Sequence, residues 1–297
     1  MSKALVLGGG GPVGIAWESG LIAGLAQAGV DLATADHIIG TSAGSFVGAL
    51  LALGHAPDVL AAPYAKMTVT PGAVARHTGL GSATPEDLAY LAEKMSEAAT
   101  SERPGQQVLL ELAALALRAR TIPEQQFIDS FGAFLRALPD DVWPEHSYAC
   151  TAVDTTNGEF VVWDHASGVS LARAVASSCA VPGVFPPITI KGRRYMDGGM
   201  RSMTNADLAR GHDHVLILAM LASPPDSPLA QRYLAPLDRE VAALRASGAD
   251  VVVVTPDTQC LDAFGPNLLD YRRSGDAAKA GARQASNEAA RLREFWR

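Results

Sequence analysis

The chain has 297 residues, of which 24 are Lys or Arg and 31 are Asp or Glu, giving a net charge of −7. This acidic balance, without a cluster of basic residues, argues against nucleic acid as a partner, because binding to a phosphate backbone requires a local excess of Lys and Arg. With 48% hydrophobic and 19% charged residues, the chain is not a disordered protein and can form one or two domains with a sizeable core. Arginine supplies 19 of the 24 basic residues, and with the abundant alanine this indicates GC-rich bacterial coding.

The three cysteines, Cys150, Cys179 and Cys260, suggest neither a disulfide framework nor a zinc-ligand spacing, so we expect a reducing compartment and no metal. The N-terminus lacks the pattern of a secretory leader. Residues 37–57 include no charged side chain, but their strongly apolar part, 46–53, has only 8 residues, whereas a membrane span needs about 20. We therefore expect a cytoplasmic chain without a signal peptide or a transmembrane span.

Short apolar runs alternate with helical patterns in the first part of the chain. A predicted strand at residues 4–7 is followed by a glycine-rich turn and a helix at 15–28. A second strand at 37–39 leads through residues 40–44 into a helix that ends near residue 53. Two successive strand–turn–helix units are typical of a mostly parallel sheet covered by helices.

From about residue 58 to 138 the pattern changes to helices separated by loops rich in Gly, Pro, Ser and Thr. Residues 109–117 and 127–138 are apolar with a helical period, whereas residues 68–83 have few large apolar side chains and are expected to be mobile. We interpret this block as a helical insertion over the sheet and not as a separate domain, because no predicted strand would complete a second core.

Strands resume after the insertion. Residues 148–153 and 159–163, connected by a turn that includes Asn157 and Gly158, predict a hairpin. The remaining predicted elements are a helix at 171–178, a strand at 193–196, a strand at 215–220, a helix at 234–244, a strand at 251–255 and a polar, alanine-rich helix from about 276 to the end.

The strongest local signal for chemistry is Gly40-Thr41-Ser42-Ala43-Gly44, between a short apolar strand and an apolar helix. A nucleophile elbow has this pattern, because the serine lies on a sharp, strained turn and small flanking residues allow other chain segments to approach. The helix that follows directs the positive end of its dipole at Ser42. A chance Gly-X-Ser-X-Gly in a flexible turn is the alternative, and the strand–turn–helix context favours the nucleophile.

A second signal is the glycine-rich loop after the first strand, which formally has the dinucleotide pattern Gly9-X-Gly11-X-X-Gly14. A nucleotide site also requires an acid that closes the second strand, but Asp31 and Asp36 both precede that strand. Glycine amides could instead point at one oxygen and form an oxyanion hole. A tight turn with close helix packing explains the motif equally well.

A nucleophilic Ser42 requires a base. Among the seven histidines, His214 is the best candidate for a Ser–Asp–His order, although it opens a predicted buried strand. The rival is Asp197, between a hairpin edge and Gly198-Gly199. An aspartate has an ordinary pKa of about 3.9, so it could act as a base only in a dry site that raises its pKa or in concert with attack.

These motifs stand in the order, and with the surroundings, found in the patatin-like phospholipase family. The segments concerned are Gly9–Gly14, Gly40–Gly44, Ser178–Pro187 and Asp197–Gly199. The chain therefore resembles that family over about residues 3–210. The resemblance implies a three-layer α/β/α fold with a mostly parallel central sheet and a helical insertion at about 58–138. It also implies a single domain, 1–297, that includes a C-terminal strand and helices at 211–297.

The resemblance also implies roles for individual residues. Ser42 would be the nucleophile and Asp197 the general base of a dyad without histidine, and the amides of Gly9, Gly10 and Gly11 would form the oxyanion hole. The glycines that support these motifs would be Gly14, Gly40, Gly44, Gly198 and Gly199. No cofactor or metal is implied. Two positions depart from the family: Val13 replaces a usual basic residue, and Met203-Thr204-Asn205 stands where Asn-X-Pro is common.

The implied activity is that of a serine lipid acyl hydrolase of the phospholipase A, lysophospholipase or carboxylesterase type, acting on a lipid or small ester. An acyltransferase that uses the same serine and a non-enzymatic nucleotide-binding module are the alternatives. A negative chain has no general attraction to anionic membranes, so we expect membrane contact to be local and transient. The insertion would be the acyl-chain lid, with apolar walls formed by Leu109, Leu110, Leu112, Leu115, Leu117, Phe127, Phe131 and Phe134.

Overall fold

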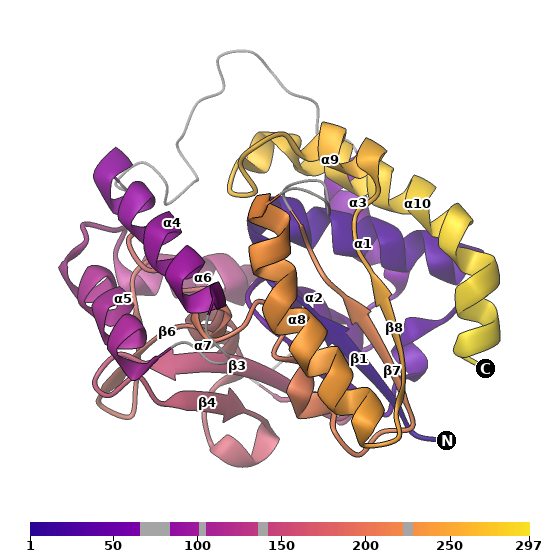
Figure 1. The fold of residues 1–297 in the computed structure, drawn as a ribbon, viewed down its shortest axis with the longest axis horizontal. Coiled ribbons are helices and arrows are strands. Elements are labelled where there is room, and N and C mark those ends of the chain that lie inside the picture. The colour runs from indigo at the N-terminus through magenta and orange to yellow at the C-terminus, as the bar shows by residue number, and fades with distance from the viewer. Residues whose placement is uncertain (66–83, 101–104, 136–141, 222–227) are drawn as a thin grey trace.

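The protein is built on one eight-stranded sheet (Figure 1). The structure is a computed structural model and describes residues 1–65, 84–100, 105–135, 142–221 and 228–297. The main path of the sheet is β5-β6-β3-β2-β1-β7-β8, with β4 paired to β3. The strands are β1 (Lys3–Leu7), β2 (His37–Gly40), β3 (Tyr148–Asp154), β4 (Phe160–Trp163), β5 (Ile188–Ile190), β6 (Arg193–Asp197), β7 (His214–Leu218) and β8 (Asp250–Val254).

Helices cover both faces of the sheet, and Figure 1 shows α1 and α10 on one side and α8 on the other. The α-helices are α1 (Gly11–Gln27), α2 (Ala43–Ala52), α3 (Pro57–Ala65), α4 (Pro85–Thr100), α5 (Gln106–Arg118), α6 (Glu124–Leu135), α7 (Leu171–Ser178), α8 (Pro228–Ala246), α9 (Thr258–Phe264) and α10 (Ser274–Phe295). The resulting three layers confirm the predicted fold class.

The alternation of side chains along β1 explains these layers. Leu5 and Leu7 point into a large cluster with residues of α1, α2 and α10. Ala4 and Val6 point into the opposite cluster, which is closed by α8. A strand buried on both faces is characteristic of a parallel sheet, and β1 pairs in parallel with both β2 and β7.

The pairing of β3 brings two distant strand ends together. β2 runs parallel to β3 as far as the pair Gly40–Cys150, while β6 runs antiparallel to β3 and ends at the pair Ala152–Asp197. Both lie along the same edge of β3, because β4 occupies the other edge over Cys150–Val153. The carboxyl ends of β2 and β6 therefore face each other, two residues apart in the register of β3.

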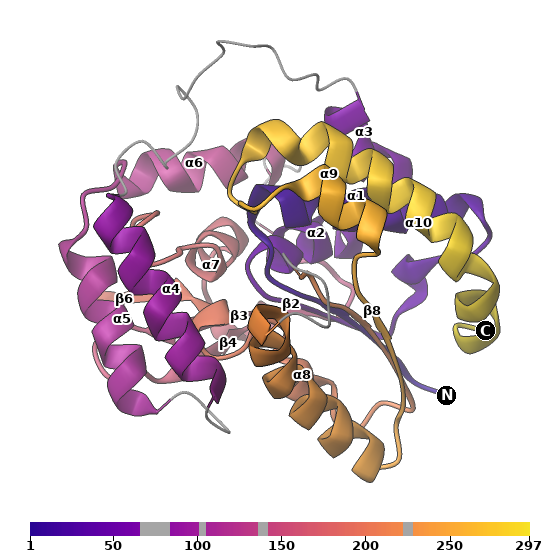
Figure 2. The same cartoon turned by 45° about the horizontal axis from the view of Figure 1, so that its top comes forward.

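The insertion α4–α6 covers the β3–β6 end of the sheet, far from the C-terminal end of α10 (Figure 2). Leu109, Leu112 and Leu115 are buried in one cluster with the sheet residues Val153 and Met196, so these proposed lid residues form part of the core. Phe127 is likewise buried, whereas Leu117 is 45% exposed. The predicted lid side chain of Phe134, the expected mobile segment 68–83 and residues 136–138 of the predicted helix lie outside the described residues.

Most predicted elements are present, and the hairpin and the helix at Leu171–Ser178 are confirmed. The first helix begins at Gly11, four residues earlier than predicted. Pro12 lies in its first turn, where the missing N–H of proline leaves no helical hydrogen bond unmade, so the end of the glycine loop is itself helical. The short strand β5 and helix α9 were not predicted from the sequence.

Candidate active site

Ser42 lies at the sharp turn between β2 and α2. Its φ of 52° and ψ of −116° place a non-glycine residue in a conformation that normally favours glycine. A Cβ on Gly44 would lie 2.1 Å from the carbonyl oxygen of Leu7, and a Cβ on Gly40 would lie 2.4 Å from Cα of Ser45. Both motif glycines are therefore required by the close approach of chain segments around Ser42, as a nucleophile elbow demands.

The strained peptide of Ser42 is held by the C-terminal end of α7. The Ser42 N–H donates to Ser178 Oγ at 3.0 Å, and the Cys179 thiol donates to the Ser42 carbonyl oxygen at 3.1 Å. Ser45 Oγ donates to the same carbonyl at 2.6 Å. Side-chain contacts on both polar groups of one residue fix the orientation of its peptide. Ser178 was part of a predicted helix, and no local pattern indicated this contact.

Asp197 is only 1% exposed and Ser42 is 6% exposed. Gly199 N–H donates to Asp197 Oδ1 at 2.7 Å. Burial raises the pKa of Asp197 to about 7, although the nearby Ser42 hydroxyl and the Gly199 N–H lower it. The structure thus brings together the predicted nucleophile and base, and it makes the carboxylate a stronger base than an exposed aspartate.

The glycine loop lies against this pair, since a Cβ on Gly9 would be 3.3 Å from Ser42 Cβ. The Gly9 N–H already donates to the Met203 carbonyl at 2.7 Å, so it is occupied. The amides of Gly10 and Gly11, at the start of α1, have no acceptor among the described residues. These two amides, together with the dipole of a 17-residue helix, are the donors available to an oxyanion.

Gly14 and Gly198 support the site by close packing. A Cβ on Gly14 would lie 3.3 Å from that of Ala43, where α1 meets α2. A Cβ on Gly198 would lie 2.2 Å from Thr151 Oγ1, so a side chain there would push the loop after Asp197 away from β3.

His214 lies at the other end of the strands. It opens β7 and pairs with Lys3 at the start of β1, whereas the Ser42 turn follows Gly40 of β2, which pairs with Leu7 at the end of β1. The structure therefore does not support a Ser–Asp–His triad with His214. None of the histidines in the described part of the chain hydrogen-bonds to Ser42 or Asp197.

The dinucleotide interpretation lacks its acidic residue. Asp31 accepts from Ala33 N–H at 3.0 Å and caps a short 3₁₀ helix. Asp36 accepts from Lys3 N–H at 2.7 Å, at the opposite end of β1 from the glycine loop. Both carboxylates are thus used structurally, away from the place where a ribose would bind.

A surface cavity of about 410 Å³ lies at the N-terminal end of α7, whereas Ser42 contacts the C-terminal end of that helix. Its lining includes Arg173 and Glu124, which form an ion pair with each other at 3.2 Å. In the described ranges no group of three His, Cys, Asp or Glu residues could hold a metal ion, and none of the helices described is long and apolar enough to cross a membrane.

Comparison with known proteins agrees with this geometry. The family model of patatin-like phospholipases matches residues 5–210, which include the elbow, the glycine loop and Asp197. The chain belongs to the patatin-like phospholipase family. Fungal relatives include lysophospholipase nte1 of Aspergillus niger, 27% identical over 78% of this chain, and lysophospholipase NTE1 of Coccidioides immitis, 30% identical over 67%. The matched stretches span only 12% and 10% of those relatives.

Two solved structures are also similar to this patatin-like chain. VipD from Legionella pneumophila has a TM-score of 0.48 at 16% identity, covering 99% of this chain and 67% of VipD. The ExoU–SpcU complex of Pseudomonas aeruginosa has a TM-score of 0.41 at 18% identity, covering 98% of this chain and 52% of the matched chain.

Proposed function

We propose that this patatin-like protein is a serine lipid acyl hydrolase with a Ser42–Asp197 dyad. The observation that carries the proposal is that the Ser42 hydroxyl, on a strained turn, lies beside the buried carboxyl of Asp197, whose pKa burial raises to about 7. A base works best when its pKa lies near the working pH. Burial therefore gives Asp197 the property for which other serine hydrolases use histidine.

The reaction proceeds in two acyl-transfer steps. Asp197 takes the proton of Ser42 as Oγ attacks the ester carbonyl, and the amides of Gly10 and Gly11 stabilise the oxyanion. Collapse of the tetrahedral intermediate expels the alcohol, which receives the proton from Asp197 and leaves an acyl-serine. A water molecule then attacks the acyl group and gives its proton to Asp197, and the second collapse returns that proton to Ser42. Gly9, whose amide is bound to Met203, shapes the hole and donates nothing to it.

The substrate class proposed is a lipid ester, with a lysophospholipid supported by the names of the fungal relatives. Val13 offers no charge to an anionic head group, so a neutral ester fits the site equally well. Contact with a membrane surface would be local and transient because the chain is acidic. Cytoplasmic location stays a prediction.

Labelling with a fluorophosphonate probe tests the proposal, because the probe reacts with activated serines. We expect labelling of the wild type, loss of labelling in Ser42→Ala and strong reduction in Asp197→Asn, with hydrolysis of a short-chain nitrophenyl ester lost in parallel. His214→Ala is the control and should keep both activities. Folded wild-type protein that resists the probe would exclude the hydrolase. Product analysis with an added alcohol acceptor separates hydrolysis from acyl transfer.

A further inference from the structure

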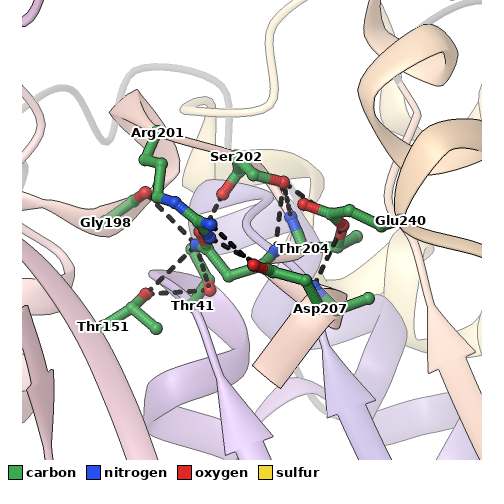
Figure 3. A network of polar contacts seen from close by, with 10 residues as sticks. Thr41, Thr151, Gly198, Arg201, Ser202, Thr204, Asp207 and Glu240 are labelled. Carbon is green, nitrogen blue, oxygen red and sulfur yellow. Dashed lines mark hydrogen bonds and ion pairs between the residues drawn. The ribbon is translucent and has the colours of Figure 1, made fainter. Parts of the chain in front are cut away.

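Asn205 contacts Thr41, Gly198 and Ser202, which belong to the network of polar contacts that Figure 3 shows. It is completely buried and has a φ of 49°, in the left-handed region. Its side-chain nitrogen, Nδ2, lies 2.7 Å from the Ser202 carbonyl oxygen and 3.0 Å from Thr41 Oγ1. The amide has two hydrogens, so its longer contacts share a hydrogen with one of these two acceptors. Gly198 O at 3.3 Å is the next acceptor.

These acceptors belong to the two segments that hold the dyad. Thr41 directly precedes Ser42, and Gly198 directly follows Asp197. The orientation of the Gly198–Gly199 peptide determines whether the Gly199 N–H points at the Asp197 carboxylate, which it meets at 2.7 Å. One side-chain amide thus connects the turn of the nucleophile with the loop of the base.

An ion pair fixes which way the Asn205 amide points. Arg201 Nη1 donates to Asn205 Oδ1 at 2.7 Å, so the nitrogen is directed at the acceptors named above. Arg201 also forms a bidentate pair with Asp207, at 2.9 and 2.6 Å, and lies 4.2 Å over the ring of Phe160. A guanidinium group that is held by a carboxylate and an aromatic ring has little freedom to change its orientation.

The same loop is anchored to α8 and to the glycine loop. Thr204 Oγ1 donates to Glu240 Oε2 at 2.5 Å, and Figure 3 shows these two side chains together. The Ala206 N–H donates to the same oxygen at 2.9 Å. The carbonyl of Met203, which directly precedes Thr204, accepts the Gly9 N–H. The segment from Gly198 to Asp207 therefore contacts the base, the nucleophile turn and the oxyanion loop, and Asn205 is its only described side chain that donates to the nucleophile turn.

We propose that Asn205 is a positioning residue, whose side-chain amide fixes the Thr41–Ser42 turn relative to the Asp197–Gly199 loop so that the serine hydroxyl and the carboxylate meet. The inference rests on the proposed dyad. Asn205 belongs to Met203-Thr204-Asn205, the segment where the chain departs from the Asn-X-Pro of its family, and Asp207 holds the Arg201 side chain that orients it.

Kinetics of a soluble nitrophenyl ester test this role in Asn205→Ala and in Thr41→Val, which removes the acceptor on the other side of the same contact. A displacement of catalytic groups by about 1 Å can cost about 100-fold in rate. We expect kcat to fall by about that factor in Asn205→Ala while KM changes by less than about threefold. The double variant should lose no more than the larger single loss, because both changes break one connection.

The pH profile separates positioning from general loosening. When the Gly199 N–H no longer points at Asp197, the carboxylate loses a stabilising partner, so the acid limb of kcat/KM should move to higher pH in Asn205→Ala. The other groups facing Asp197 are the Ser42 hydroxyl and the Cys179 thiol, and neither is changed. Thr204→Val is the matched control, since it removes a hydrogen bond from the same loop but none from Asn205. It should lower the melting temperature and leave kcat and the acid limb in place.

Three results would overturn the inference: kcat of folded Asn205→Ala within threefold of wild type, additive losses in the double variant, or an equal loss in Thr204→Val. Where Asn205→Ala does not fold, Thr41→Val alone decides, and unchanged kcat in that variant refutes the role. Fluorophosphonate labelling keeps the two proposals apart. An unlabelled wild type contradicts the dyad itself, whereas a labelled wild type with equally fast labelling of Asn205→Ala contradicts only the positioning role.

Discussion

Replacing Asp197 with asparagine should inactivate the protein and at the same time stabilise it in a way that depends on pH. The carboxyl is 1% exposed, and burial raises its pKa from an ordinary 3.8 to about 7. An acid whose pKa rises on folding binds more protons in the folded state, so its ionisation destabilises the fold as pH increases between the two values. Asparagine has no such ionisation, and its side chain can still accept from Gly199 N–H and donate to Ser42 Oγ.

The magnitude follows from the two pKa values. Each pH unit between them changes the free energy of unfolding by 1.36 kcal/mol, so the full effect of the shift is about 4 kcal/mol. The loss for the wild type begins above about pH 4 and ends slightly above pH 7. In the accessible range from about pH 5 to pH 8, the advantage of Asp197→Asn should grow by about 2.5 kcal/mol, and it should be constant above that range.

Urea unfolding of wild type and Asp197→Asn at several pH values measures this difference, because the contributions of all other titrating groups are the same in both proteins and cancel. Asp262→Asn, which removes an exposed carboxylate from α9, controls for the change in net charge. A difference between wild type and Asp197→Asn that does not change from pH 5 to pH 8 would refute the reasoning. In that case Asp197 would ionise as an ordinary surface acid, and its burial could not explain its strength as a base.

Three further predictions concern the surroundings of the dyad. Ser178→Ala leaves the buried Ser42 N–H without its partner; kcat should fall about tenfold with unchanged KM, as expected for about 1–1.5 kcal/mol, and a KM effect alone would contradict this. Glu18 is completely buried in α1, and burial raises its pKa well above the usual range. The stability of Glu18→Gln relative to wild type should therefore increase with pH above about 4.5, by about 1.4 kcal/mol per pH unit. A difference in urea unfolding that does not change with pH would disprove this. Gly44→Ala places a Cβ 2.1 Å from the Leu7 carbonyl and should lower the melting temperature and abolish ester hydrolysis; an unchanged melting temperature would show that the elbow and β1 are not in close contact.

The sheet and the turns that carry Ser42 and Asp197 could be predicted because their signals are local. Buried strands such as Val215–Leu218 read as continuous apolar runs, and the glycines around Ser42 and after Asp197 mark close approaches that no other residue permits. Composition could not give the pairing along β3, which places the ends of β2 and β6 opposite each other. The order of the motifs, compared with a known family, supplied only the expectation that Ser42 and Asp197 share one site.

The contacts that hold the dyad were not predictable, because they join residues far apart in sequence without a local pattern. Ser178 and Ser42 are separated by 136 positions, and Asn205 and Thr41 by 164. Serine and asparagine are also ordinary in loops and at helix ends, so nothing in their neighbours marks them. The hydrogen bond of the Gly9 amide is a similar case, since its acceptor is the backbone carbonyl of Met203. Every residue has such a carbonyl, so the sequence does not indicate which one accepts.

A base without histidine makes demands on the fold that a triad avoids. Imidazole titrates near neutral pH by itself, whereas a carboxylate reaches a pKa of about 7 only when water is excluded, as at Asp197. The same exclusion prevents water from orienting the carboxylate, so protein groups must do so, and the Gly199 N–H is the one that binds Oδ1. Each added donor also lowers the pKa and weakens the base. At Asp197 few groups donate to the carboxylate, which keeps its pKa high. The loop that carries the Gly199 donor is instead held by Asn205, which Arg201 in turn orients. In the proposed mechanism, Arg201 and Asp207 would therefore hold the loop in place without contacting the carboxylate, so that Asp197 would be fixed in position and its pKa would not be lowered further.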